Sequence, residues 1–143
     1  MRLFLFLILF CGRTAAAQNV SDSTDRIFGL ACGGSGELPP LMYSTIRLVN
    51  KTNFSELRKL SNSSNNQEKI HGLVGLYILS KKGYKLTTAD KKQFLIAKMS
   101  DVIIYNCEGC DFNKKTHLKE LITDQMLQTY YNSYKYYNWK SFQ

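Results

Sequence analysis

The spacing of hydrophobic residues predicts a chain built mainly of amphipathic helices. Glu68–Lys82 has the strongest pattern, because its apolar side chains recur every three or four residues, as on one face of a helix. These positions are Ile70, Leu73, Val74, Leu76, Tyr77, Ile78 and Leu79. So broad an apolar face predicts a central helix. Gly72 and Gly75 inside it either let a neighbouring helix approach closely or are tolerated, at up to about 1 kcal/mol each relative to alanine.

Two shorter helices are predicted before this segment. Pro39-Pro40 opens the first, because proline fits the first helical turn, where its missing N–H costs nothing. The second spans Asn53–Ser61, with Thr52 or Asn53 as its cap and Glu56 placed as in a capping box. These signals mark where each of the two predicted helices begins.

Another helix is predicted after the central one, at Thr88–Met99. Gly83 is suited to end the preceding helix, and Thr87 or Thr88 can cap the new one. The apolar side of this helix is supplied by Phe94, Ile96, Ala97 and Met99.

Val102–Asn106 is short, apolar and β-branched, so a strand and one or two helical turns both fit. We expect helix, because the rest of the chain is helical and contains no Asn-Gly or Asp-Gly hairpin signal.

Residues 115–143 predict a C-terminal helix with an aromatic tail. The predicted fold is all-α, a compact right-handed bundle of about five helices. Residues 18–143 would form a single domain, with 18–26 disordered.

The first 17 residues have the anatomy of a secretory signal peptide. Arg2 is basic, Leu3–Phe10 is an unbroken apolar run, and Ala15–Ala17 forms a small-residue cleavage site. The run is shorter than the about 20 apolar residues that span a bilayer. We therefore expect cleavage near Ala17 and a mature protein that is exported, either periplasmic or secreted.

The chain is basic, with a formal net charge of +8 at pH 7. The predicted leader contains Arg2 and Arg13, so its removal leaves 17 Lys and Arg residues against 11 Asp and Glu, or +6. These charges are spread along the chain, which favours a solvated surface over a dedicated polyanion site. For an exported protein we expect no nucleic-acid partner.

Three cysteines remain after removal of the leader: Cys32, Cys107 and Cys110. An odd number indicates one disulfide with a free thiol, pairing between molecules, or a metal site. A disulfide from Cys32 to either of the others is as plausible as the local Cys107-x-x-Cys110 pair. A redox pair is disfavoured because Glu108 raises the pKa of a neighbouring thiol. Zinc would need a fourth ligand such as His117, and no metal site or cofactor is predicted.

The sequence contains no constellation typical of catalysis. His71 and His117 are interpreted as residues at helix boundaries, and neither is accompanied by a nucleophile and an acid in a recognisable arrangement. The carboxylates are scattered without catalytic spacing. We therefore expect a protein that is not an enzyme.

The aromatic tail supplies the candidate binding residues, which are Tyr131, Tyr134, Tyr136 and Trp139. Tyrosine and tryptophan are favoured at interfaces because they combine apolar bulk with a polar group. The tail could instead dock the last helix on the bundle. A contact with a protein or the cell envelope and a stacking site for a glycan are the alternatives.

Part of the chain resembles a HEAT-type repeat. The resemblance rests on Leu57–Ser63 followed by Lys69–Leu79, and Leu95–Ile104 looks like the first half of another unit. Over about residues 28–110 the chain is similar to small exported helical proteins of Bacteroidetes-type bacteria. This implies one to one and a half HEAT-like helix pairs in a compact bundle, since a solenoid needs about three repeats.

The resemblance implies a scaffold for protein contacts and carries no catalytic residues. The leading hypothesis is therefore an exported, non-catalytic protein-interaction module of unknown partner. The alternatives are a thiol or metal protein that uses Cys107 and Cys110, and an envelope or glycan binder that uses the aromatic tail.

Overall fold

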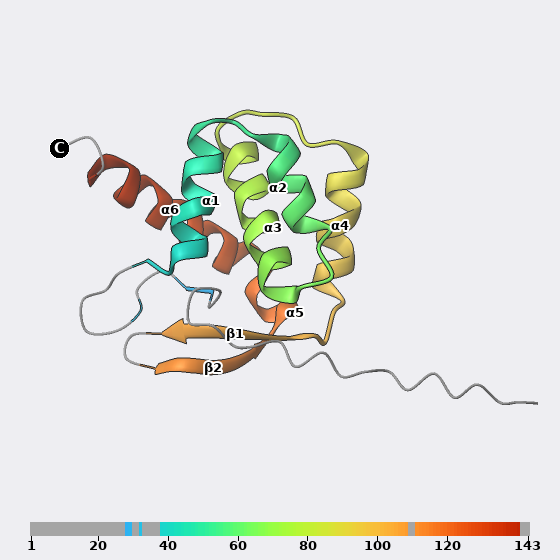
Figure 1. Ribbon diagram of the computed structural model, residues 1–143. Coiled ribbons are helices and arrows are strands. Elements are labelled where there is room, and N and C mark those ends of the chain that lie inside the picture. The colour runs from blue at the N-terminus through green and yellow to red at the C-terminus, as the bar shows by residue number, and fades with distance from the viewer. Residues whose placement is uncertain (1–27, 30–31, 33–37, 109–110, 141–143) are drawn as a thin grey trace, which may run out of the picture.

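A computed structural model describes residues 28–29, 32, 38–108 and 111–140 (Figure 1). Within this part of the chain there are six helices and one two-stranded sheet. The helices are α1 (Pro40–Asn50), α2 (Phe54–Ser61), α3 (Asn66–Lys81), α4 (Thr88–Lys98), α5 (Leu118–Leu121) and α6 (Asp124–Lys140). The strands are β1 (Ile103–Glu108) and β2 (Asp111–His117). The protein is therefore mostly helical, as expected.

The helix α3 is the centre of the molecule. Ten of its 16 residues are buried, and α1, α2 and α6 all pack against it (Figure 1). Asn65 caps its N-terminus by accepting hydrogen bonds from the backbone N–H groups of Gln67 and Glu68. At its other end Gly83 has a φ of +94°, a conformation that glycine adopts without strain.

Gly72 lets α2 lie directly against α3. A Cβ at this position would lie 2.7 Å from the backbone carbonyl oxygen of Leu57 and from the carbonyl carbon of Leu60, and would also meet the backbone nitrogen of Ser61. All three atoms belong to the α2 backbone, which cannot give way as a flexible side chain does. Of the two interpretations of Gly72, the structure therefore favours close helix approach.

The expectation of an all-α fold is wrong at residues 103–117, which form an antiparallel hairpin. The predicted helix Val102–Asn106 is instead β1, which pairs with β2 in a register that places Ile103 opposite His117. Burial alternates over residues 103–106, with Ile103 exposed, Ile104 fully buried, Tyr105 half-buried and Asn106 buried. A period of two is the pattern of a half-buried strand. The β-branched residues thus follow their intrinsic strand preference, supported by pairing with β2.

The hairpin also shortens the predicted C-terminal helix. The expected helix over 115–143 begins inside β2, and the chain becomes helical only at α5 and α6. The half unit expected at Leu95–Ile104 is affected in the same way, because the short helix expected at its end, Val102–Asn106, lies largely in β1. One helix pair of the expected form remains, α2 with α3, joined by a short turn and running in opposite directions (Figure 1).

None of the helices in the described residues is long and apolar enough to cross a membrane. The predicted signal peptide at 1–17, the segment 18–26 and Cys110 lie outside the described residues, and so does the side chain of Trp139.

Candidate functional site: the exposed face of α4

The N-terminus of α4 is fixed by a capping box. Thr87 Oγ1 accepts a hydrogen bond from the backbone N–H of Asp90 (3.1 Å), and Asp90 Oδ2 accepts one from the backbone N–H of Thr87 (2.8 Å). Two of the N–H groups at the helix start are thereby satisfied. Of the two predicted caps, Thr87 is the one used.

An ion pair between Arg58 and Asp90 joins α4 to α2. Arg58 donates from Nε to Asp90 Oδ1 and from Nη2 to Oδ2, both at 2.8 Å. The Asp90 side chain is only 4% exposed. The pKa of Asp90 is lowered from 3.8 to about 2, chiefly by the hydrogen bonds from Arg58 and also by those from Thr87, although burial acts in the opposite direction. Asp90 is therefore a structural carboxylate that stays ionised at neutral pH.

The rest of α4 is held by few contacts. Gln93 Nε2 donates to Asn62 Oδ1 of the α2–α3 turn at 2.8 Å. Lys98 Nζ lies 2.9 Å from Asp124 Oδ1 at the start of α6. Among the apolar side chains of α4 only Ala97 is buried, and Phe94 packs half-buried against the core. Polar contacts at its two ends thus carry much of the attachment of α4.

As a consequence, the outer side of α4 is apolar and exposed. Leu95 is 61% exposed, Ile96 47%, Met99 75% and Ile103, at the start of β1, 48%. Within the described residues, the other large hydrophobic side chains with comparable exposure are all tyrosines, namely Tyr43, Tyr84 and Tyr136. The exposed aliphatic residues therefore gather in nine consecutive positions, and we call Leu95, Ile96, Met99 and Ile103 the α4 patch.

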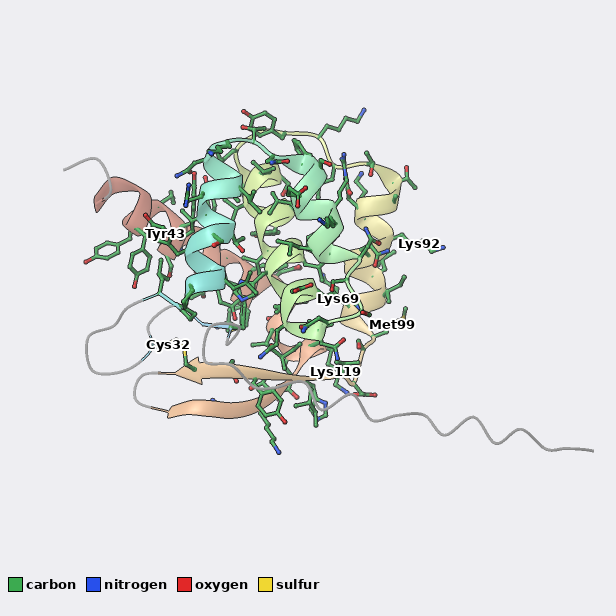
Figure 2. The ribbon with its side chains drawn as sticks, viewed as in Figure 1. Cys32, Tyr43, Lys69, Lys92, Met99 and Lys119 are labelled. Atoms are coloured by element: carbon green, nitrogen blue, oxygen red, sulfur yellow. A yellow bond between two sulfur atoms is a disulfide. The ribbon has the colours of Figure 1, made fainter. Side chains whose placement is uncertain are left out.

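The spacing of Leu95, Ile96 and Met99 places these three members of the α4 patch side by side. Met99 follows Leu95 by four residues and Ile96 by three, and residues so spaced are neighbours on a helix surface. Lys92 precedes Leu95 by three residues and extends the row toward the N-terminus. Lys92 and Met99 both lie at the outer edge of the molecule (Figure 2).

A disulfide lies near the C-terminal end of β1, away from Ile103 at its start. Of the pairings that the sequence leaves open, the structure contains Cys32–Cys107, with Cα atoms 5.4 Å apart. Cys107 therefore has no thiolate to offer in this state. A redox or metal site that uses Cys107 with Cys110 would first need this bond to be reduced.

Phe28 lies in the core beside the disulfide, where backbone hydrogen bonds join it to β1. The Phe28 N–H donates to the carbonyl oxygen of Tyr105 (3.1 Å), and Cys107 N–H donates to that of Phe28 (2.9 Å). The fully buried Phe28 ring lies edge-on to His71 and Tyr130, with centroids 5.0 and 4.8 Å apart. His71 is thus a core residue rather than the boundary residue that was expected.

The candidate binding tyrosines divide into structural and exposed residues. Tyr134 is buried, and its hydroxyl donates to Asn50 Oδ1 (2.7 Å) and accepts from Lys82 Nζ (3.2 Å), which joins α6 to the ends of α1 and α3. Tyr131 is half-buried and stacks on Tyr134 at 6.5 Å. Tyr136 is exposed. The tail therefore serves at least partly to dock α6.

No match to this chain was found among family models, curated proteins or solved structures. In the part of the chain that the structure describes, no three His, Cys, Asp or Glu side chains are grouped as a metal site requires. His117 lies on the surface, with Nδ1 2.8 Å from the carbonyl oxygen of Asp101. The α4 patch is therefore the surface feature on which a functional argument can be built.

Proposed function

We propose that the protein is an exported, non-catalytic interaction module that binds a partner protein through the α4 patch. The observation that carries this proposal is the exposure of Leu95, Ile96 and Met99 at neighbouring positions on one side of α4, with Ile103 exposed four residues further along the chain. Single exposed apolar residues are ordinary, whereas a contiguous apolar patch rimmed by polar side chains is typical of a binding surface.

The way in which α4 is held supports the same proposal. A helix that packs by its apolar side would bury that side against the bundle, as α3 does. In α4 only Ala97 and Phe94 pack inward, beside the Arg58–Asp90 and Lys98–Asp124 ion pairs, and Leu95, Ile96 and Met99 are left exposed. The rigid capping box presents them without a large ordering cost on binding.

A HEAT-like relation between α2 and α3 fits this proposal. The two helices run in opposite directions around a short polar turn, and α4 lies at the free edge of the pair (Figure 1). In an array of such pairs, a helix in that position would be covered by the next unit. In this protein the partner would cover α4 in place of a further repeat unit. Export rests on the sequence pattern of residues 1–17.

Gel filtration of the exported fraction tests the proposal. Wild-type protein should elute in a complex larger than the mature chain, and a Leu95→Ser/Met99→Ser variant should elute as the isolated chain. A Tyr43→Ser/Tyr136→Ser variant is the matched control, because it removes two large side chains elsewhere that are also more than half exposed. Elution of the wild type as an isolated chain, or loss of the complex only in the tyrosine variant, contradicts the proposal.

The same variants must remain folded for this comparison. Leu95 and Met99 are more than half exposed, so their replacement should change the free energy of unfolding by no more than about 0.5 kcal/mol. Urea denaturation of both variants checks this directly.

A further inference from the structure

The charged side chains around the α4 patch point to the chemistry of its partner. Lys91 and Lys92 are exposed in the first half of α4, and neither forms an ion pair with any other described residue. The acidic residue of the helix, Asp90, is buried and already bound by Arg58. The face that carries Leu95 is therefore flanked by unpaired positive charge and by no exposed carboxylate from α4 itself.

We infer that the α4 patch binds an acidic amphipathic helix of a partner protein, an inference that rests on the proposed function. A helix partner fits because α4 presents a ridge of side chains at intervals of three and four residues, and such ridges pack into the grooves of another helix. Carboxylates beside the partner's apolar stripe would lie against Lys91 and Lys92. Complementary charge of this kind selects the partner and speeds its association.

A second copy of this chain fits the surface less well. Two α4 patches facing each other would bring Lys91 and Lys92 of both copies to the interface. The carboxylates at the other end of α4 are already paired, Asp124 with Lys98 and Asp101 with Lys119. Self-association would thus add like charges or require existing pairs to break, and both oppose it.

An anionic membrane also fits less well. The apolar face of α4 contains Leu95, Ile96 and Met99 but no exposed aromatic residue, whereas interfacial helices commonly insert tryptophan or phenylalanine. Lys98 and Lys119, near the C-terminal end of α4, are each paired with a carboxylate, Asp124 and Asp101, so they attract an anionic surface less than free lysines would.

The test is a selection from a library of random peptides of about 16 residues, long enough for about four helical turns. The mature, disulfide-intact protein is immobilised, and soluble Leu95→Ser/Met99→Ser protein removes peptides that bind elsewhere. Enriched peptides should carry net negative charge, with apolar residues three and four positions apart. Their binding should weaken as salt is raised.

Two charge variants then test the role of the lysines. Lys91→Glu/Lys92→Glu should weaken binding of the enriched peptides about tenfold, the effect expected when exposed pairs become repulsive. Arg47→Glu/Lys51→Glu makes the same change in net charge at two exposed positions, one in α1 and one directly after it, and should leave binding within about twofold.

The outcomes separate this inference from the proposed function. Patch-dependent peptides that are neutral or basic, or that bind the Lys91→Glu/Lys92→Glu variant equally well, overturn the acidic partner and leave the docking surface standing. Failure to enrich any patch-dependent peptide overturns both. Self-association lost in the Leu95→Ser/Met99→Ser variant would identify a second copy as the occupant, and patch-dependent binding to phosphatidylglycerol vesicles would identify a membrane; either result overturns the inference.

Discussion

Replacing Asp90 by asparagine should destabilise the protein in a strongly pH-dependent way. The side chain is 4% exposed and accepts two hydrogen bonds of 2.8 Å from Arg58. Asparagine has nearly the same shape and keeps an oxygen that can accept from the Thr87 N–H. The substitution therefore removes the negative charge while leaving much of the capping box in place.

The magnitude follows from the pKa of Asp90, which is lowered from 3.8 to about 2, chiefly by the hydrogen bonds from Arg58. Each unit of difference between the folded-state and unfolded-state pKa corresponds to about 1.4 kcal/mol, so the ionised carboxylate contributes about 2.5 kcal/mol at pH 7. Because the pKa of the folded state is the lower one, this contribution is fully present above pH 3.8. It is lost as the pH falls through the folded-state pKa of about 2.

Urea denaturation of the wild type and Asp90→Asn, from pH 7 downward, measures this effect. The difference in the free energy of unfolding should be about 2.5 kcal/mol at pH 7 and about 1.3 kcal/mol at pH 3. At still lower pH the two proteins should converge, because a protonated Asp90 is as neutral as asparagine. Arg58→Met and the double variant complete a cycle that should give a coupling energy of about 2 kcal/mol at pH 7. A difference below about 0.5 kcal/mol at pH 7, or one independent of pH, would refute the reasoning.

Three further substitutions follow from the packing, each read out by urea denaturation. Cys32→Ser/Cys107→Ser should lower the free energy of unfolding by about 4 kcal/mol, because the disulfide closes a loop across 75 positions. As a check, the free energy of unfolding of the wild type should fall by an equal amount in reductant. Gly72→Ala should cost at least about 2 kcal/mol and more than Gly75→Ala, since a Cβ at Gly72 meets α2 backbone whereas one at Gly75 meets side-chain methyl groups; the reverse order would be incompatible with this geometry. Phe28→Ala should cost about 3–5 kcal/mol if the fully buried ring belongs to the core, and a cost near zero would place it outside.

The helices were predictable where a broad apolar pattern coincides with local capping signals. α3 has both, and the segment Glu68–Lys82 lies within two residues of its observed ends. Asn53 accepts from the backbone N–H of Glu56 at 3.2 Å, so one of the two candidate caps of α2 is the one used. These features depend on neighbours within a few residues, and the sequence specifies them directly.

The hairpin was missed because its decisive contacts are distant in sequence. The sequence of Val102–Asn106 fits either a helix or a strand. The strand is selected by pairing with β2 on one edge and with Phe28 on the other. Gln67 adds a third contact, since its Nε2 donates to the carbonyl oxygen of Tyr105 at 2.7 Å. None of these contacts is visible in the local pattern. Long-range pairing therefore overrode a prediction based on the helical context.

The candidate site was missed for a related reason. Phe94, Ile96, Ala97 and Met99 were identified as the apolar side of a helix, and such a side normally faces the core. The structure buries Ala97 and leaves Ile96 and Met99 exposed. The pattern shows which side of α4 is apolar, but not which of these side chains the rest of the chain covers. Conversely, Tyr134 was identified as a binding candidate, and its hydrogen bonds to Asn50 and Lys82 tie it to the bundle.

Site-specific photo-cross-linking in the producing cell tests the α4 patch as a protein-binding surface most directly. A photoreactive amino acid is placed at Met99, which is 75% exposed, and in separate proteins at Tyr43, which is 55% exposed on α1. Met99 lies at the outer edge of α4, and Tyr43 lies on the opposite side of the molecule (Figure 2). A discrete protein adduct from Met99 that is absent from Tyr43 is the predicted result. The same adducts from both positions, or an adduct from Tyr43 alone, would contradict the account.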